Sequence, residues 1–557
     1  MAIHYQAGYG MRAPYETSIG SWTRRSTFFW AATGATVGFS NLWQFPYLAH
    51  KHGGGLFVLL YIACLLLVTL PLMLTEAAVG RHSRHGIVLT MDGFIRQGRL
   101  SRGWMWVGRF SVLAAFVVLS FTAVIGAICL AYVFFGALGT FTGQGEAEVV
   151  EVLANLVSDR NSYRQFMGWH GFFLLLVLWV SMQGVALGLE RTLRVVVPGL
   201  YLTLLVFLGY SVSQGDLQAS AGYLLSFRPE DLGWRSLQLA LFHAFFTLGL
   251  GMGVWAVFGA YMAKTTPLKR AVFGVVLMDT LFAIVAGLAI YALVLPVSAG
   301  AGEQGFGLLF VALPLSLAEV PGSQFVIAAV YLMIVLVAWT TALALLEPLV
   351  GWFREWTGAP RGWSVTVIGV LVWLAGLATL FSFNIWSDVL LLGGSIFRWL
   401  ELIASGLLIP LVSILLAVFV GWKLSHPVAF GLIGQAPWLI SRIWFWVMRL
   451  VLPVVVAYIG VQYSIHSLNE LCGDGEVRGV CQPINAIRSQ PPVDELPALP
   501  DTPEVPEAPG APAEDSGPGV WPPEAPAAGQ SPAPEGAEPP AGDKGQQRER
   551  EILYHSA

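Results

Sequence analysis

Charged residues are scarce in this chain: Lys, Arg, Asp and Glu make up 11% of its 557 residues, whereas hydrophobic residues make up 56%. Soluble globular domains carry about 25% charged residues, so the composition excludes an ordinary soluble protein. The net charge of −4 also argues against nucleic-acid binding, which relies on an excess of basic residues. The composition instead predicts an all-α polytopic protein surrounded by membrane lipid.

Cysteine is also rare, with four residues in the whole chain. Cys64 and Cys129 lie within apolar segments and are interpreted as small buried residues. Cys472 and Cys481 lie in a short loop, where the sequence permits either a disulfide or two free thiols. The sequence also lacks metal-ligand spacings, phosphate-binding loops and nucleophile elbows, so it does not predict an enzyme.

Apolar runs of about 20 residues, the length that crosses a bilayer, recur along the chain. Residues 1–21 lack the short apolar run and the cleavage site of a secretory signal, so the first span is expected to be retained. A transmembrane domain is predicted at residues 22–467, with eleven spans at 23–48, 55–80, 107–138, 169–187, 193–213, 236–262, 270–297, 325–353, 363–383, 386–421 and 438–465.

Basic residues gather in the loops after spans 2, 4 and 6, and the positive-inside rule places these loops and residues 1–21 in the cytoplasm. The residues are Arg81, Arg84, Arg96, Arg99, Arg102, Arg191, Arg194, Lys264, Lys269 and Arg270. An odd number of spans then places the C-terminus outside, beyond an extracytoplasmic loop at residues 468–482. The prediction is a multi-pass protein of the plasma (inner) membrane.

The last part of the chain, residues 483–557, is rich in Pro, Ala, Glu and Gly and poor in aliphatic residues. Such a segment cannot bury a core and is expected to be disordered. A spacer, a partner-binding arm and a dispensable tail are all open interpretations of it.

Two of the apolar spans are interrupted by glycine, at residues 34–41 and 247–253. A broken membrane helix exposes backbone groups that lipid cannot satisfy, so protein, water, an ion or a solute has to occupy the break. Breaks at matching positions in two halves of a chain are typical of transporters with inverted repeats around a central site. For one motif alone, Gly34 and Gly38 would fit a small-residue helix-packing face about as well.

The segment from Gly34 to Tyr47, preceded by Trp22 and followed by three glycines at 53–55, resembles the neurotransmitter:sodium symporter family. The resemblance continues in order through spans 2, 6 and 8 and the loop before span 8. Its further motifs are Pro71-Leu72-Met73, Glu76, Gly80-Arg81, residues 245–251, residues 307–314, Thr340-Thr341 and Glu347-Pro348.

The resemblance implies an inverted-repeat (5+5) sodium symporter fold, with repeats at residues 22–213 and 236–421 and with broken helices 1 and 6. An eleventh span is a layout similar to that of bacterial members. The implied activity is sodium-dependent symport of an amino acid or an amino-acid-like solute by alternating access. The solute and one or two Na+ ions would bind halfway across the membrane; the sequence leaves the oligomeric state open.

Sodium prefers oxygen ligands, which unwound carbonyl groups and hydroxyl groups supply inside a membrane. By the resemblance, one sodium site uses the carbonyl groups of Gly34, Val37 and Val337 with the side chains of Thr340 and Thr341. The alternative for the two threonines is a hydrogen bond back to their own helix.

The other implied sodium site uses the carbonyl of Thr36 with Asn41, Thr247 and Asp279, where the family usually has asparagine. An unpaired carboxylate inside a membrane costs ~2.5–3.5 kcal/mol on insertion scales, so Asp279 is a functional candidate. The alternative is that Asp279 lies near the end of its helix and has no role in ion binding.

Three positions that the family associates with chloride read Tyr61, His243 and Ala283. If Asp279 supplies the negative charge, chloride is not required, and His243 would either pair with Asp279 or be an ordinary buried histidine.

Backbone amides at the broken span 1 would hold a solute carboxylate. Span 1 lacks the aspartate that members carrying aromatic amines often have, which favours a solute with its own carboxylate. The family's span-3 tyrosine is not evident, and Phe121 or Thr122 takes its place. The substrate-binding residues implied by the resemblance are Ala35, Gly38, Phe39, Thr122, Phe246, Gly249, Met252, Ala342 and Leu345.

The family closes its outer side with an arginine and an acid, which here read Gln44 and Glu401. Outer closure is therefore expected to depend on Phe246. At the inner gate, Trp22, Tyr261 and Glu355 match the family, but Ile19 stands where an arginine is expected. Arg24 or Arg25 would have to replace that arginine, or the gate would be loose.

Glu76 and Glu347 match acidic or polar positions that the family buries near its centre. By this resemblance they are expected to hold helices together, through a shared proton or a water bridge. The altered gate positions Gln44 and Ile19 also fit a solute-binding receptor or accessory protein that does not transport. Asp279 fits a symporter with proton or single-sodium coupling. Sodium-dependent uptake and the sodium stoichiometry discriminate among these alternatives.

Overall fold

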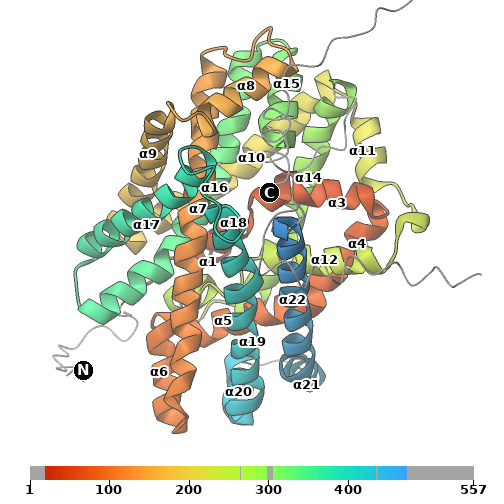
Figure 1. Cartoon of the computed structure of the whole chain (residues 1–557). Helices are drawn as coiled ribbons and strands as arrows, with labels where there is room; N and C mark the ends of the chain where they lie inside the picture. Colours follow the sequence, from red (N-terminus) through yellow and green to blue (C-terminus); the bar gives the residue numbers. More distant parts are fainter. Residues whose placement is uncertain (1–18, 264, 298–304, 306, 435–436, 473–557) are drawn as a thin grey trace, which may run out of the picture. The chain divides into compact units, whose positions relative to one another are not determined.

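The computed structural model describes residues 19–263, 265–297, 305, 307–434 and 437–472, and this part of the chain is built from helices (Figure 1). The α-helices are α1 (Thr27–Thr36), α2 (Phe39–Leu42), α3 (Gln44–Lys51), α4 (Gly55–Cys64), α5 (Leu70–Ser83), α6 (Ile87–Gly98), α7 (Met105–Ala137), α8 (Glu146–Val157), α9 (Tyr163–Met182), α10 (Arg191–Gln214), α11 (Leu217–Leu225), α12 (Trp234–Thr247), α13 (Val254–Tyr261), α14 (Leu268–Val297), α15 (Leu313–Ala318), α16 (Ser323–Thr357), α17 (Arg361–Phe383), α18 (Ile396–Glu401), α19 (Ile409–Val418), α20 (His426–Ile433), α21 (Trp438–Trp446) and α22 (Leu452–Cys472).

Short segments of tighter or wider helix join several of these helices into longer ones. They are η1 (Leu65–Thr69), η2 (Arg102–Trp104), η3 (Val185–Glu190), η4 (Pro229–Asp231), η5 (Leu308–Ala312), η6 (Leu402–Leu408), η7 (Phe419–Lys423) and η8 (Val447–Val451).

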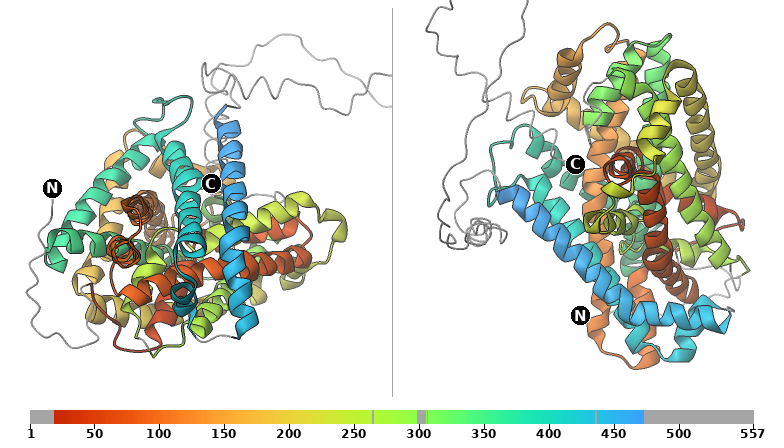
Figure 2. Two further views of the ribbon diagram at one scale, coloured as in Figure 1. Left: turned by 90° about the horizontal axis from the view of Figure 1, so that it is seen from below. Right: turned by 90° about the vertical axis from the view of Figure 1, so that its right-hand side faces the viewer.

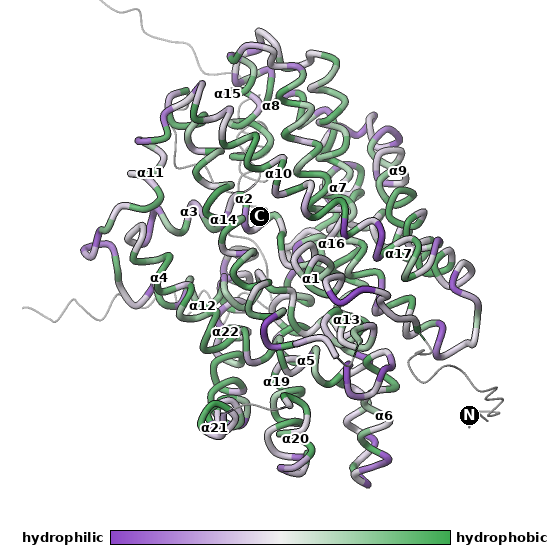
Figure 3. Tube along the Cα trace, turned by 180° about the vertical axis from the view of Figure 1, so that it is seen from behind, coloured by the Kyte–Doolittle hydropathy of each residue, from purple (hydrophilic) through white to green (hydrophobic). Residues whose placement is uncertain are grey.

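Nine helical segments of the described residues are long and apolar enough to cross a membrane. They are Gly55–Ser83, Arg102–Ala137, Tyr163–Met182, Val185–Gln214, Leu268–Val297, Ser323–Thr357, Arg361–Phe383, Ile396–Lys423 and Trp438–Asn469. Figure 3 shows hydrophobic residues along these helices and hydrophilic residues at the loops. The chain is therefore an integral multi-pass membrane protein.

The two other predicted spans are interrupted, one as α1, α2 and α3 and the other as α12 and α13, so neither forms a single long helix. The total of eleven spans and the internal repeats stay predictions.

The predicted boundary between spans 4 and 5 is wrong. α9 ends at Met182 and the next span begins at Val185, rather than at residues 187 and 193. Gly184 lies between them with φ of 98°, a left-handed value that favours glycine and breaks the helix. Apolar residues continue through the turn, so hydropathy does not detect it.

The predicted start of span 10 at residue 386 is also wrong, because the helix begins at Ile396. The apolar residues before it form a turn in which Leu391 and Gly394 pair through their backbones. The hydroxyl of Ser395 then accepts a hydrogen bond from the amide of Arg398 and caps α18. At the other end of the domain, α22 continues to Cys472, beyond the predicted limit at residue 467.

The start of α1 is fixed by an acid from the beginning of span 5. The carboxylate of Glu190 accepts hydrogen bonds from the amides of Thr23 and Arg24, at 2.7 and 3.0 Å, and from the hydroxyl of Thr27 at 2.7 Å. The two amides belong to residues that precede α1, and a negative charge beside the N-terminus of a helix interacts favourably with the helix dipole. The N-terminal part of span 1 is thus anchored to span 5.

Pairs of helices pack closely around the interrupted segments: α7 lies along α16, α5 along α13, and α19 along α22. Figure 2 shows α22 beside α19 in both views. α5 and α13 approach so closely that a Cβ added to Gly80 would lie 1.8 Å from the carbonyl oxygen of Ala256, and one added to Gly259 would lie 2.0 Å from that of Ala77. Only glycine allows this backbone contact on both sides.

Cys64 and Cys129 are buried and free, as predicted. The predictions for the side chain of Cys472, for Cys481, for residues 1–18 and for the tail at 483–557 lie outside the described residues.

Candidate functional site

The first interrupted span is held in shape by an asparagine side chain. α1 ends at Thr36, and Val37 and Gly38 take extended backbone conformations before α2 begins. Oδ1 of Asn41 accepts a hydrogen bond from the amide of Gly38 at 3.2 Å. Carbonyl groups at this break are released from the helical ladder, as the sequence predicts.

The second interruption depends on three glycines between α12 and α13. Gly249, Gly251 and Gly253 have φ values of 59°, 73° and 73°, which glycine adopts without strain. The buried carboxylate of Glu76, from α5, accepts a hydrogen bond from the amide of Gly251 at 3.1 Å. An acid from span 2 therefore satisfies backbone that the break exposes.

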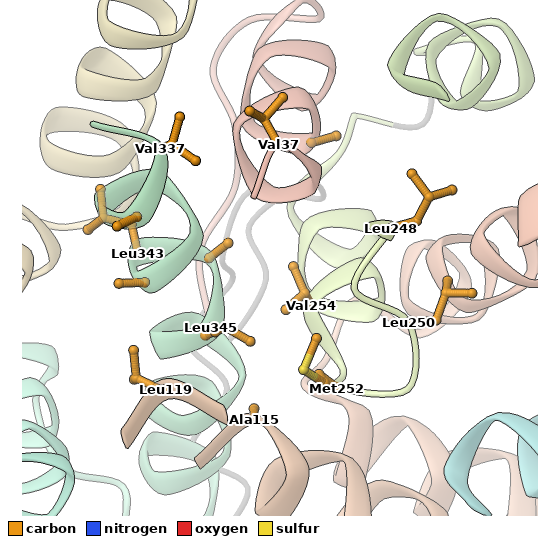
Figure 4. Packing of buried hydrophobic residues seen from close by; sticks show 14 of the residues in the cluster. Val37, Ala115, Leu119, Leu248, Leu250, Met252, Val254, Val337, Leu343 and Leu345 are labelled. Atoms are coloured by element: carbon orange, nitrogen blue, oxygen red, sulfur yellow. The ribbon is translucent and has the colours of Figure 1, made fainter. Parts of the chain in front are cut away.

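A cavity of about 140 Å³ lies where the two interruptions meet α7 and α16. Figure 4 shows part of its apolar surroundings, with Met252 and Val254 on one side and Leu345 of α16 on the other. The described residues that line it include hydroxyl and indole groups and no charged side chain. They are Ala35, Thr36, Gly38, Ser40, Val118, Phe246, Thr247, Leu248, Gly249, Met252, Val254, Trp255, Thr341, Ala344 and Leu345.

Most of the predicted substrate-binding residues line this cavity: Ala35, Gly38, Phe246, Gly249, Met252 and Leu345. Three others do not line it. The ring of Phe39 stacks on Trp43, with 5.4 Å between the centroids. Thr122 and Ala342 are buried elsewhere in the packing of their helices.

Sequence reasoning missed several lining residues, among them Ser40, Val118 and Trp255. Val118 lies one helical turn before Thr122 on the same face of α7, so the prediction had the correct face and the wrong turn. Ser40 stands between two predicted residues, and its hydroxyl was the available signal.

One cluster of oxygen atoms lies beside the cavity and centres on Asp279 of α14. The Asp279 carboxylate accepts hydrogen bonds from Nδ2 of Asn41 at 3.0 Å, from Oγ1 of Thr247 at 3.2 Å and from Oη of Tyr61 at 3.4 Å. Thr247 also lies 3.3 Å from Oδ1 of Asn41. Asp279 is completely buried and lies well inside α14, so the alternative of a helix-end carboxylate is wrong.

A second cluster of oxygen atoms joins α1 to α16. Oγ1 of Thr341 lies 3.2 Å from the carbonyl oxygen of Val37 and 3.1 Å from that of Val337. The hydroxyl of Thr340 bonds to the same Val337 carbonyl at 3.1 Å. Gly34 allows the approach, because a Cβ there would lie 3.3 Å from Cβ of Thr340 and 2.6 Å from Val197.

Thr341→Val is expected to lower the affinity for sodium about tenfold, because it removes one oxygen from the second cluster while keeping the shape of the side chain. Binding of 22Na+ to the purified protein measures the effect. Thr366→Val, which removes an exposed hydroxyl from α17, is the matched control. An unchanged sodium affinity in Thr341→Val would remove this cluster from the ion sites.

Comparisons with known proteins show similarity to sodium-dependent transporters in sequence and in fold. A family model described as the sodium:neurotransmitter symporter family matches residues 19–143. YhdH of Bacillus subtilis, an uncharacterized sodium-dependent transporter, is 28% identical over 438 residues, which cover 78% of this chain and 95% of the relative. An uncharacterized sodium-dependent transporter of Haemophilus influenzae is 25% identical over 451 residues, covering 79% of this chain and 97% of the relative.

The crystal structure of MhsT in complex with L-phenylalanine has the same fold, with a TM-score of 0.71 and 27% sequence identity, covering 79% of this chain and 99% of that chain. The family model, the relatives and the solved structure all agree with the resemblance to sodium:neurotransmitter symporters. They support sodium-dependent symport of an amino-acid-like solute.

The two residues predicted for the outer gate, Gln44 and Glu401, contact different side chains. Nδ1 of His243 lies 3.2 Å from Oε1 of Gln44 and the residue is buried, which fits the alternative of an ordinary buried histidine better than a pair with Asp279. Glu401 accepts a hydrogen bond from Oη of Tyr463 at 3.0 Å and lies 3.5 Å from Arg398.

Two of the residues predicted for the inner gate, Trp22 and Tyr261, lie side by side. The ring of Trp22 packs edge-on against Tyr261, with 5.1 Å between the centroids, and the amide of Trp22 donates to the Tyr261 carbonyl at 2.9 Å. Oη of Tyr261 donates to Glu347 at 2.6 Å. The third predicted residue, Glu355, instead accepts the amide of Gly86 at 3.0 Å.

Two arginines, Arg354 of span 8 and Arg361 of span 9, contact the residues predicted for the inner gate or their neighbours. Arg354 donates to the carbonyl oxygen of Ile19 at 3.1 Å, at the position where the symporter family has an arginine. Arg24 and Arg25 are exposed, so the prediction that one of them replaces that arginine is not supported. The side chain of Arg354 therefore holds the segment before α1 through the backbone of Ile19.

The two buried acids of the symporter have separate partners. Glu76 accepts the backbone amide described above, whereas Glu347 forms an ion pair with Arg361 and accepts the hydroxyl of Ser181 at 3.1 Å. Each acid joins helices, as predicted. The carboxylate oxygens of Glu347 have Arg361, Tyr261 and Ser181 as partners, in place of the predicted shared proton or water bridge.

Proposed function

We propose that this protein couples the entry of Na+ to the uptake of an amino-acid-like solute, by alternating access to the cavity between the two interrupted helices. The observation that carries the proposal is the position of that cavity, which is bordered by both clusters of oxygen atoms. Transport needs no covalent chemistry, so the side chains have only to bind, release and move.

The cluster around Asp279 has the chemistry of a sodium site. Its oxygen atoms come from Asn41, Thr247 and Asp279, and Thr36 lies on the cavity wall beside them. Hard cations take oxygen ligands, and a carboxylate in a membrane needs a counter-charge. We assign this cluster to one sodium ion, with Asp279 as the fixed negative charge that makes chloride unnecessary.

The cluster at Gly34, Val37, Val337, Thr340 and Thr341 is our second sodium site. Carbonyl and hydroxyl oxygens from α1 and α16 meet there, so an ion would bind the two helices together. Release of that ion would free the cytoplasmic half of span 1 from span 8.

The solute is expected to be neutral overall and to carry its charges at one end. The polar groups of the cavity lie near the first interruption, whereas Val118, Met252 and Leu345 form an apolar wall. Ser40 of α2 adds a hydroxyl to the polar end of the cavity. An amino acid with an apolar side chain fits both parts of the cavity.

The orientation in the membrane is part of the proposal. The Arg354 bond to Ile19 and the Trp22–Tyr261 contact close one end of the cavity, which we take as the cytoplasmic end because basic loops gather there. The repeats at 22–213 and 236–421 would then rock against each other to open the other end in turn.

Uptake by proteoliposomes tests the function. We expect radiolabelled L-phenylalanine, or another neutral amino acid of a panel, to accumulate under an inward sodium gradient and not under a matched potassium gradient. Sodium-dependent binding without accumulation would indicate a receptor instead, and proton movement at constant sodium would indicate altered coupling. No response to sodium in binding or uptake would contradict the proposal.

A further inference from the structure

Tyr463, near the end of the last described span, contacts both elements expected to close the outer side of the cavity. Its hydroxyl donates to Oε1 of Glu401 at 3.0 Å. Its ring stacks on Phe242, with 5.2 Å between centroids and 8° between planes, and lies 5.7 Å from Phe246. Phe246 itself lines the cavity.

Close packing between spans 10 and 11 fixes the position of this tyrosine. A Cβ added to Gly460 would lie 2.8 Å from Pro410, and one added to Gly406 would lie 2.7 Å from Oγ of Ser464 and 3.4 Å from the Tyr463 ring. The two glycines let the helices approach until little free space is left beside the ring. Tyr463 can therefore transmit the position of span 11 to its neighbours.

The first span does not supply the charged partner that the family uses at this gate. Gln44 is neutral, and its Oε1 lies 3.2 Å from His243. A tyrosine hydroxyl bonded to a carboxylate is a charge-assisted hydrogen bond, which is stronger than a bond between two neutral groups. In addition, stacked aromatic rings resist separation.

We propose that Tyr463 is a positioning residue of the outer gate: it holds Glu401 through its hydroxyl and supports Phe246 over the cavity through its ring. Opening of the outer path then requires Tyr463 to separate from one of these partners, so span 11 takes part in gating. This inference rests on the proposed function, because it assigns a role at the same cavity.

The test compares Tyr463→Phe, Glu401→Gln and the double variant, with Tyr458→Phe as the matched control. Tyr458 is on the same helix and its hydroxyl bonds to Gln238 of α12, away from Glu401. Dissociation of radiolabelled L-phenylalanine from the purified protein in sodium is expected to be about tenfold faster in each single variant. The double variant should show a less than additive effect, because both changes weaken the Tyr463–Glu401 bond, while Glu401→Gln also weakens the contact with Arg398.

A second measurement separates this inference from the proposed function. Hydrogen exchange of residues 234–247 in sodium, without solute, should increase in Tyr463→Phe and stay unchanged in Tyr210→Phe, which removes a hydroxyl of α10 that bonds to the carbonyl oxygen of Pro321. The melting temperature should stay within a few degrees of the unmodified protein in both variants. If the unmodified protein does not bind L-phenylalanine, the hydrogen exchange of residues 234–247 alone tests the role of Tyr463.

Equal exchange and equal dissociation in Tyr463→Phe and its controls would overturn the inference even where sodium-dependent binding stands. Additive effects in the double variant would overturn the Tyr463–Glu401 link in the same way.

Discussion

Asp279→Asn is expected to weaken sodium binding by about a hundredfold, or about 2.8 kcal/mol at about 1.4 kcal/mol for each factor of ten. The Asp279 carboxylate accepts hydrogen bonds from Asn41, Thr247 and Tyr61 and is completely buried. The asparagine side chain of the variant has nearly the same shape as the aspartate but carries no charge. A bound sodium ion would therefore lose its counter-charge in a medium of low dielectric constant. Binding of 22Na+ and sodium-dependent solute uptake both measure the loss.

Chloride provides the discriminating condition for this variant. If Asp279 replaces the chloride ion of other members, added chloride should restore part of the activity of Asp279→Asn and leave the unmodified protein unaffected. Asp92→Asn is the control, since Asp92 pairs with Arg96 on α6, away from the cavity. Wild-type sodium affinity without chloride sensitivity would place Asp279 outside the ion sites.

Arg361→Met is expected to destabilise the protein by about 3–5 kcal/mol, because it leaves the carboxylate of Glu347 buried without its charged partner. Glu347 is fully buried and Arg361 is 11% exposed, so water cannot replace the lost contact. Arg361 also donates to the carbonyl oxygen of Ser181 at 2.7 Å, and this link between spans 4 and 9 would be lost as well. The melting temperature in detergent measures the effect.

Removing both charges provides the control. The double variant Glu347→Gln, Arg361→Met keeps an uncharged amide that can still bond to Tyr261 and Ser181, so most of the lost stability should return. An exposed arginine changed in the same way, Arg164→Met, should have little effect. If Arg361→Met melts like the unmodified protein, the ion pair does not stabilise the inner gate.

Local sequence was sufficient to predict the interrupted helices. Three glycines within five residues, at 249, 251 and 253, permit the left-handed backbone of the second break, and nothing distant is needed to detect them. The cluster around Asp279 could likewise be proposed from matching motifs, since Asn41 and Thr247 sit at the breaks. The assignment of ions to these residues stays a proposal.

Contacts between distant segments could not be predicted in this way. Arg354 binds a backbone carbonyl of Ile19, and backbone groups carry no sequence signal. Tyr463 reaches Glu401 only because Gly406 and Gly460 allow two helices to approach. Similarly, one helical turn separates Val118 from Thr122, and hydropathy within an entirely apolar helix does not distinguish such turns.

The backbone contact between α5 and α13 has a practical consequence for following motion in this protein. At Gly80 and Gly259 the backbones of α5 and α13 are in direct contact, which leaves no space for one helix to slide along the other. The two helices should therefore move together as one rigid body. α13 is fully buried and offers no place for a spectroscopic probe. Leu67, 66% exposed on the same span as α5, faces outward, so a label there would report the displacement of the hidden half-helix without touching the cavity.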